Sequence, residues 1–324
     1  MQLARADAWR LERDLGELAS GTHTIVAGPW LGEVGFEILY WVPFLAWFAE
    51  RFNVDPGRLL VVSRGGTASW YASFAHRYRD VLDYVTPEAF QAHHHARVRE
   101  IGEQKQTRRT GFEREVIAKV AGEAGIGGDR VLHPSTMYRL LRPFWWGHMD
   151  ESWVHQHTRY RRHTAVDRAE IPQLPSSYSA VKFYFNDCFP ATERNRAFVQ
   201  NIVTRLAQEG PVVSLSTGRA LDDHGACAVA GHGVIDLARA GPPARNLHVQ
   251  STVVAHARRF VGTYGGFAYL APFYGVPSTA YFGDAAGFAR SHLRMAQSAF
   301  ATIGAGDLLD VRSVIDDSVA HPLT

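Results

Sequence analysis

The sequence predicts an α/β protein made of two domains, each a parallel β-sheet covered by helices. Short, continuously apolar segments alternate with helix-like stretches, and this alternation occurs twice along the chain. Parallel strands that are buried on both faces have this continuously apolar character. The length of 324 residues accommodates two domains of ordinary size. The region 150–179 lacks periodicity and is the expected linker, so we expect domains at 1–170 and 171–324.

The expected elements follow from the apolar segments in order. In the first domain we expect strands at 24–27, 59–63 and 130–135, and a long apolar helix that follows the loop 28–35 and ends near residue 52. The polar, charge-rich segment 88–128 is expected to be an insertion or a mobile excursion. In the second domain we expect strands at 178–185, 211–216, 259–262 and 278–282, and helices at 193–208, 249–259 and 267–274.

Composition and charge narrow the class of protein. Hydrophobic residues make up 46% of the chain and charged residues 20%, which is typical of a globular protein. A net charge of +2 does not indicate a nucleic-acid-binding protein. Cys188 and Cys227 form no CxxC pair, which fits a reducing compartment, and neither a signal peptide nor a membrane-spanning run is found. We expect a cytoplasmic protein, and the apolar stretch 36–48 leaves peripheral contact with a membrane surface open.

The segment RRFVGTYGGFAYLAPFYGVPSTAYFGD, residues 258–284, is the most informative part of the chain. A strand leads into a turn with two glycines, and a helix begins directly after them. A helix N-terminus of this kind binds anions, because its free N–H groups and its dipole both favour negative charge. The segment therefore predicts a phosphate-binding corner at Thr263, Tyr264, Gly265, Gly266 and Phe267. The alternative is a tight turn that serves only helix–strand packing.

This segment resembles the donor-binding part of GT-B glycosyltransferases, and bacterial heptosyltransferase-like enzymes of O-antigen and polysaccharide biosynthesis carry a similar arrangement. The residues that carry the resemblance are Val261-Gly262, Gly265-Gly266, Ala271-Pro272, Gly275-Val276-Pro277-Ser278 and Phe282-Gly283. The resemblance implies two Rossmann-like domains that face each other across a cleft. It also implies an N-terminal acceptor-binding domain and a C-terminal domain that binds a nucleotide-diphosphate sugar as substrate, with no cofactor.

Lys182 is a polar interruption in the apolar strand 178–185. In the enzymes that the chain resembles, a basic residue in this region balances the charge of the departing diphosphate, as a metal ion does elsewhere. The alternative is a salt bridge to Asp187 or Glu193.

Two further segments are expected to hold the nucleoside. Gln250 and Ser251 lie where the resembled enzymes place the base and ribose, although Ser251 or Asn246 could instead cap a helix. The segment Thr217-Gly218-Arg219 follows the strand 211–216 and is assigned the same role.

Inverting glycosyl transfer needs a general base that removes the proton of the acceptor hydroxyl. The resemblance implies that an acid after a glycine in the first loop fills this role, and Gly32-Glu33 matches that position. Glu37 lies one turn further and could share the same helix face. The alternative for both is a first-turn acid that complements the helix dipole.

The acceptor is expected to contact Trp30, Arg64, His133 and Arg142. Aromatic rings beside hydrogen-bonding groups suit sugars, since the C–H faces of sugars pack on rings. Arg64 could hold an anionic group such as a lipid diphosphate. The alternatives are core packing for the aromatic residues and a surface turn at Arg64.

No metal site is expected. Adjacent histidines such as His93, His94 and His95 cannot all face one ion, and no HExxH or DxD motif is present.

The sequence therefore predicts an inverting, metal-independent glycosyltransferase, a hexosyl- or pentosyltransferase acting on a saccharide or a lipid-linked saccharide. A nucleotide-sugar epimerase on the same fold is one alternative. A non-catalytic GT-B-like binding or assembly subunit is the other; in that case the basic run 159–163 and the helix 36–48 would contact a partner or a membrane.

Overall fold

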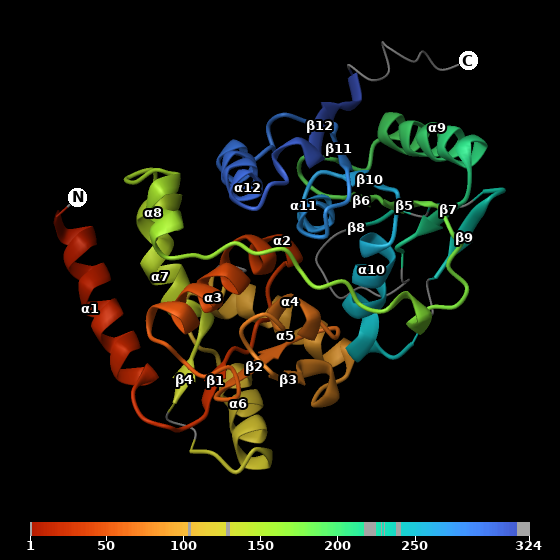
Figure 1. Cartoon of the computed structure of the whole chain (residues 1–324). Coiled ribbons are helices and arrows are strands. Elements are labelled where there is room, and N and C mark those ends of the chain that lie inside the picture. Colours follow the sequence, from red (N-terminus) through yellow and green to blue (C-terminus); the bar gives the residue numbers. More distant parts are fainter. Residues whose placement is uncertain are drawn as a thin grey trace. The chain divides into compact units, whose positions relative to one another are not determined.

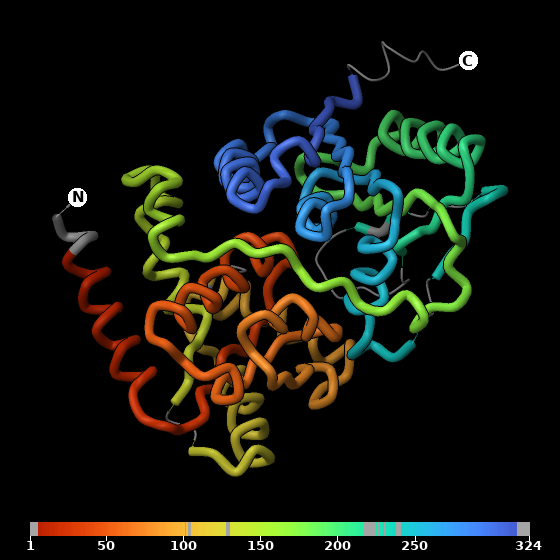
Figure 2. Tube along the Cα trace, in the orientation of Figure 1, coloured from red at the N-terminus to blue at the C-terminus, as the bar shows by residue number. Residues whose placement is uncertain are grey.

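The chain folds into two compact units, Met1–His163 and Thr164–Thr324. They are described here from a computed structural model over residues 2–102, 105–127, 130–216, 225–227, 229, 231–237 and 241–315 (Figure 2). The division falls in a stretch without regular secondary structure, 158–167, within the region that the sequence marks as a linker. Each unit is considered by itself below.

Unit 1 is an α/β unit whose described strands are all parallel, in the order β3-β2-β1-β4 (Figure 1). Every residue of β1 and β2 is buried, as expected for a sheet covered on both faces. The strands are β1 (Ile25–Ala27), β2 (Leu59–Ser63), β3 (Arg77–Asp80) and β4 (Val131–Leu132). The helices are α1 (Gln2–Ala19), α2 (Val34–Phe36), the π-helix η1 (Glu37–Trp41), α3 (Val42–Arg51), α4 (Ala68–Tyr71), the 3-10 helix η2 (Val81–Asp83), α5 (Pro87–Ile101), α6 (Gly111–Glu123), α7 (Pro134–Trp145) and α8 (Glu151–Gln156).

The apolar helix expected after the first strand is present, and a π-helical turn interrupts it at Glu37–Trp41. Pro43 accounts for part of this irregularity, because it has no N–H to donate to the carbonyl of Leu39, four residues back. The hydroxyl of Tyr160 donates to that carbonyl at 2.9 Å instead. A residue from the end of the unit therefore satisfies a backbone group that the helix leaves open.

The segment 88–128, expected as an insertion or excursion, contains two capped helices. The side chain of Thr86 accepts a hydrogen bond from the N–H of Ala89 at the start of α5. Thr110 and Glu113 form a reciprocal capping box at the start of α6. Caps of this kind specify helix starts even where the apolar pattern is weak, which is why hydrophobic periodicity alone missed both helices.

Unit 2 contains a parallel sheet in the order β12-β11-β10-β5-β7-β9. A separate antiparallel pair joins β6 and β8. The strands are β5 (Ser179–Lys182), β6 (Tyr184–Phe185), β7 (Val212–Ser214), β8 (Gly225–Ala226), β9 (Val234–Asp236), β10 (Arg259–Thr263), β11 (Ser278–Phe282) and β12 (Leu309–Ser313). The helices are α9 (Glu193–Glu209), α10 (Asn246–Ala255), α11 (Gly266–Phe273), α12 (Arg290–Thr302) and the 3-10 turns η3 (Arg168–Glu170), η4 (Pro243–Arg245) and η5 (Gly306–Leu308).

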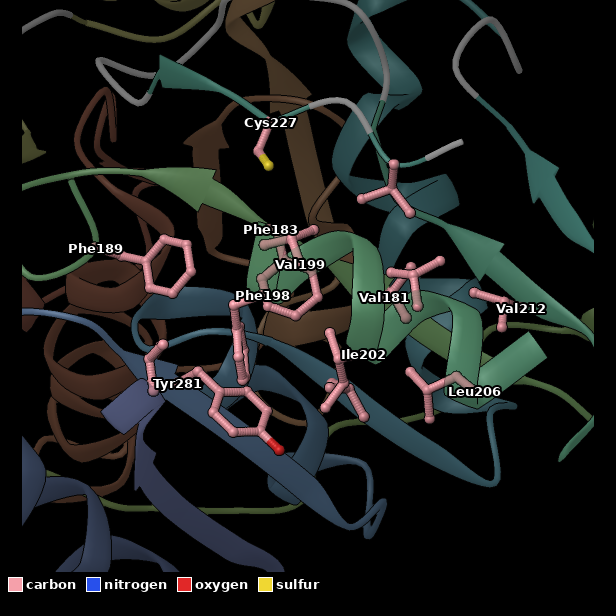
Figure 3. Close-up of a cluster of buried hydrophobic side chains, with 14 of the residues drawn as sticks. Val181, Phe183, Phe189, Phe198, Val199, Ile202, Leu206, Val212, Cys227 and Tyr281 are labelled. Carbon is pink, nitrogen blue, oxygen red and sulfur yellow. The ribbon is translucent and has the colours of Figure 1, made fainter. Parts of the chain in front are cut away.

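One core of unit 2 lies between the sheet and the long helix α9. Phe198, Ile202 and Leu206 extend from one side of α9 toward Val181 and Val212 of the sheet (Figure 3). Their spacing of four residues places them on one helix face. This packing fixes α9 against β5 and β7, and so positions the carboxyl end of β5.

The sheet of unit 2 has the strand order of a Rossmann fold. Numbered by their sequence within this sheet, its strands read 3-2-1-4-5-6 from β9 to β12. The chain adds strands on one side of β5, then crosses over and adds β10 on the other side. The prediction of an α/β chain with two Rossmann-like domains is confirmed by these two parallel sheets.

Candidate functional site

The carboxyl ends of β5 and β10 form the topological switch point of unit 2. The connections from these neighbouring strands lead to opposite sides of the sheet, which opens a crevice at their carboxyl ends. In open α/β sheets ligands bind at this position. The two strands end at Lys182 and Thr263, both of which the sequence singles out.

The turn between β10 and α11 requires glycine at position 265. Gly265 is the N-cap of α11 and has a φ of +151°, a conformation that other residues rarely adopt. A Cβ atom at this position would lie 2.1 Å from the hydroxyl oxygen of Tyr184. Gly265 and Gly266 are both half-buried, so their backbone groups remain partly accessible at the start of the helix.

Three predicted donor-site residues from distant parts of the sequence meet beside this turn. The ammonium group of Lys182 donates a hydrogen bond to Oε1 of Gln250 at 2.5 Å. The same group lies 3.7 Å from the centre of the Phe267 ring, a cation–π contact with the second residue of α11. The side-chain amide of Gln250 donates to the carbonyl of Asn246 at 3.1 Å, which orients its oxygen toward Lys182. A positive charge is thus held next to the helix N-terminus.

The other residues of the corner have structural contacts. The hydroxyl of Thr263 accepts from the N–H of Tyr184 at 3.0 Å and donates to the carbonyl of the same residue at 2.9 Å. The side chain of Tyr264 is buried against Phe288 and accepts a hydrogen bond from Tyr269, and burial raises the pKa of its phenol to about 12. These two residues contribute their backbone to the turn, while their side chains support it.

Ser251 and the segment 217–219 complete the predicted donor set. Because α10 begins at Asn246, Ser251 is a buried residue of the helix interior and not a cap. Thr217, Gly218 and Arg219 lie outside the described residues.

The loop 28–33 of unit 1 is held by buried side-chain hydrogen bonds. Gln106 donates from its amide nitrogen to the carbonyl of Pro29 and accepts from the N–H of Leu31, both at 2.8 Å. The peptide bond between Gly28 and Pro29 is cis. A buried glutamine that contacts both sides of the loop fixes its path before α2 begins.

The two candidate bases differ sharply in environment. Glu33 is exposed and extended at the N-cap of α2, where its side chain makes no capping hydrogen bond. Glu37 is fully buried in η1, where Oε1 accepts from Ser63 and Tyr71, both at 2.5 Å. The two acids therefore do not share a helix face, since Glu33 precedes the helix. Of the two, only Glu33 is exposed to solvent.

Burial raises the pKa of Glu37 to about 7, although the charge of Arg64 and the hydrogen bonds from Ser63 and Tyr71 oppose the shift. Arg64 is itself buried and donates to the carbonyl of Gly32 at 2.7 Å. It therefore connects the Glu37 cluster to the loop that carries Glu33.

Asp80, at the end of β3, belongs to the same buried region and was not singled out from the sequence. It accepts hydrogen bonds from the N–H of Gly66 at 2.7 Å and from the hydroxyl of Tyr78 at 2.8 Å. Burial raises its pKa to about 6 despite these bonds. In the sequence, Asp80 could have been recognised as a candidate because it stands at the end of a strand, directly after Arg79.

His133 lies in a second buried network of unit 1. Its Nδ1 accepts from the N–H of Ser135, so the proton is on Nε2, which lies 3.2 Å from Glu113. Glu113 also pairs with Arg97 at 2.9 Å and accepts from Gln106 at 2.6 Å. Burial opposes the charge of Glu113, but the His133 hydrogen bond and Arg97 outweigh it and lower its pKa to about 2.

The remaining acceptor candidates lie in different surroundings. Trp30 is fully buried between the rings of Trp41 and Tyr138, with centroids 5.9 and 6.2 Å away. Arg142, in contrast, is exposed and lines a cavity of about 560 Å³ together with Trp145. Trp30, Arg64 and His133 thus build the interior of unit 1, and Arg142 faces an open cavity.

The described residues contain neither a cluster of metal-binding side chains nor a helix that could span a membrane. No group of three or more His, Cys, Asp or Glu side chains converges as a metal site within them, and His93 stacks on Phe112 at 3.8 Å. In the same part of the chain, no helix combines the length and the apolar character needed to cross a membrane.

Comparison with known proteins gives matches among solved structures. No model of a known protein family matches the chain, and no curated protein matches it. A family 9 glycosyl transferase from Veillonella parvula is similar over 94% of this chain and 91% of its own, at 11% identity and a TM-score of 0.47. The ADP-heptose lipopolysaccharide heptosyltransferase II of E. coli covers 90% of each chain, at 12% identity and a TM-score of 0.46. E. coli heptosyltransferase WaaC with ADP-2-deoxy-2-fluoro heptose covers 90% of this chain and 93% of its own, at 14% identity and 0.39.

The matched structures are of the kind that the segment 258–284 resembles. The fold of the chain itself follows from its own strand orders, described above.

Proposed function

We propose that this protein is an inverting, metal-independent glycosyltransferase of polysaccharide biosynthesis. It transfers a hexose or pentose from a nucleotide-diphosphate sugar to a saccharide or a lipid-linked saccharide. The observation that carries the proposal is the meeting of Lys182, Gln250 and Phe267 beside the Gly265–Gly266 turn, at the switch point of a Rossmann-type sheet. Each of these groups comes from a different segment, and together they place positive charge where such sheets bind ligands.

The corner suits a diphosphate for electrostatic reasons. The first N–H groups of α11 have no carbonyl partner within the helix, and its dipole favours an anion. Lys182 is half-buried, so its charge is screened less than that of an exposed lysine. An ammonium group carries a full positive charge and only N–H donors, which suits the acceptor oxygens of a phosphate.

The proposed reaction exchanges one C–O bond for another. The carboxylate of Glu33 takes the proton of the acceptor hydroxyl, and the hydroxyl oxygen forms a bond to the anomeric carbon of the donor. The bond between that carbon and the phosphate oxygen breaks, and its electron pair leaves with the nucleoside diphosphate. Attack from the side opposite the leaving group inverts the anomeric configuration. Lys182 and the start of α11 stabilise the developing negative charge, so this chemistry calls for neither a metal ion nor a cofactor.

Glu37 does not contact substrate in this proposal because it is fully buried. It supports the loop before α2 through Arg64, which reaches the carbonyl of Gly32. A cytoplasmic location is part of the proposal, with peripheral membrane contact when the acceptor is lipid-linked.

The lysines of the chain offer a direct test, because they are only Lys105, Lys119 and Lys182. Brief acetylation followed by mass spectrometry reports the accessibility of each one separately. ADP, GDP, UDP, CDP or dTDP, whichever binds, should protect Lys182 and leave Lys119, which is exposed on α6, unchanged. The proposed donor site is contradicted if a nucleotide saturates the protein without protecting Lys182. It is also contradicted if none of the five nucleotides protects Lys182 at millimolar concentration.

The base is tested separately. Glu33→Gln should leave nucleotide binding intact and abolish transfer. Transfer that survives in this variant would show that the base has been assigned to the wrong residue.

A further inference from the structure

The cavity of about 560 Å³ in unit 1 lies between α1, α7 and the segment 105–108. Its volume is in the range of pockets that bind small ligands. The helices α1 and α7 are in contact with each other in the fold. The cavity therefore belongs to a single unit and is built on regular secondary structure.

The lining of this cavity is strongly basic. Lys105, Arg108, Arg139 and Arg142 all contribute to it, and none of its described lining residues is acidic. Beside the lining, Asp7 of α1 forms a bidentate pair with Arg139 and lies 4.0 Å from Arg142. The described lining therefore has four cationic side chains and no acidic one.

The arrangement of these charges follows from the helix period. Ser135, Arg139 and Arg142 are separated by four and three residues, so they lie along one face of α7, and Trp146 is the C-cap residue of this helix. The pair with Asp7 holds Arg139 in place and lowers the pKa of that aspartate, chiefly through its hydrogen bond. The helix and its C-cap thus present a hydroxyl, two guanidinium groups and an indole ring to the cavity.

Aromatic rings lie directly beside the cations. The guanidinium group of Arg142 is 4.8 Å from the centre of the Trp146 ring, and Trp146 is 63% exposed. The ammonium group of Lys105 lies 4.5 Å from the ring centre of Phe36 and 5.7 Å from that of Trp145. Exposed indole next to cations and hydroxyls provides a flat apolar surface for a sugar ring and charged donors for an anionic substituent.

We propose that this cavity binds an anionic saccharide, a sugar that carries a phosphate or a carboxylate group. Arg142, Lys105 and Arg108 bind the anionic group, and Trp146 packs against the sugar ring. The role of this saccharide as the acceptor rests on the proposed glycosyltransferase function, whereas the binding itself does not.

The test uses glucose 6-phosphate and glucuronate as anionic sugar probes. Glucose is the control without a charge, and inorganic phosphate is the control without a sugar ring. All tryptophans of the chain lie in unit 1, and two of them line the cavity, so binding can be followed by tryptophan fluorescence. At least one anionic sugar should bind at least tenfold more tightly than glucose and than inorganic phosphate, and it should protect Lys105 but not Lys119 from acetylation. Arg142→Gln and Lys105→Met should each weaken that binding by about tenfold, the size typical of a lost charged hydrogen bond.

Arg114→Gln and Lys119→Met are the matched controls, since both side chains are exposed on α6 and outside the cavity. Equal affinity for glucose and both anionic sugars, or binding that Arg142→Gln leaves unchanged, overturns the proposal. If inorganic phosphate binds more tightly than both glucose 6-phosphate and glucuronate, the cavity is a simple anion site, and the proposal is overturned as well. Failure of the donor site would instead appear at Lys182, so the two proposals fail independently.

Discussion

Replacing Glu37 by glutamine should stabilise unit 1 at high pH and not at low pH. Glu37 is fully buried, and burial raises the pKa of its carboxyl from 4.5 to about 7. In the folded protein it therefore holds its proton at pH values where the unfolded chain has lost it. Stability from this group is fully present below pH 4.5 and is lost as the pH rises to about 7, so ionisation at pH 8 costs about 3 kcal/mol, at 1.4 kcal/mol per pKa unit.

Glutamine keeps the shape of the side chain and an oxygen that can accept from Ser63 and Tyr71, but it cannot ionise. The free energy of unfolding of Glu37→Gln minus that of the parent should therefore rise by about 3 kcal/mol between pH 4.5 and pH 8. Because every tryptophan lies in unit 1, urea unfolding followed by tryptophan fluorescence reports this unit.

The matched control is Glu33→Gln, four residues earlier and exposed. It should change the free energy of unfolding by less than about 0.5 kcal/mol at either pH, as surface substitutions usually do. The reasoning is refuted if Glu37→Gln is destabilising by a constant amount at both pH values. That result would mean that Glu37 is held as a stable carboxylate by Arg64 and its hydrogen bonds.

The remaining predictions concern the second network and the glycine turn. Glu113→Gln should destabilise unit 1 by about 3–5 kcal/mol at pH 7, because it leaves Arg97 buried without its carboxylate. Urea unfolding measures this loss, with the exposed Glu115→Gln as the control, and the loss should shrink as the pH falls from 4.5 toward 2. A loss that does not depend on pH would contradict the prediction. Gly265→Ala should destabilise unit 2, because the new Cβ would lie 2.1 Å from the Tyr184 hydroxyl and the backbone φ at this position is +151°. The loss is measured as reduced hydrogen-exchange protection of α11, and adding Tyr184→Phe should restore part of this protection. If the losses of the two variants simply add in the double variant, the clash is not the cause.

The fold could be predicted where apolar segments are continuous. Strands β1, β2 and β10 are short apolar runs that end in glycine-containing turns, and the sequence places all three. Strand β3 reads Arg-Tyr-Arg-Asp and carries no apolar signal, because it is an edge strand of its sheet with only its last residue buried. Apolar periodicity cannot detect a strand that is made almost entirely of polar and charged residues.

The residues around the Gly265–Gly266 turn could be singled out because each of them stands in a recognisable local pattern. A glycine pair before an apolar helix and a lysine in an apolar strand are visible as residue patterns, and Lys182 and Phe267 do meet in the fold. The buried network around Glu37 could not be predicted, since Ser63, Tyr71 and Asp80 reach it only when separate strands and helices come together. Glu33 and Glu37 look equivalent at a spacing of four residues.

The measurement that tests the donor corner most directly compares a nucleoside with its diphosphate. The five nucleoside diphosphates and their nucleosides are titrated calorimetrically into the parent, Lys182→Met and Lys119→Met, where methionine keeps the apolar stem of lysine and removes its charge. One diphosphate should bind the parent and Lys119→Met at least tenfold more tightly than its nucleoside, and this preference should largely disappear in Lys182→Met. Equal affinities for nucleoside and diphosphate in the parent, or an undiminished preference in Lys182→Met, would contradict a pyrophosphate site at Lys182 and Gly265.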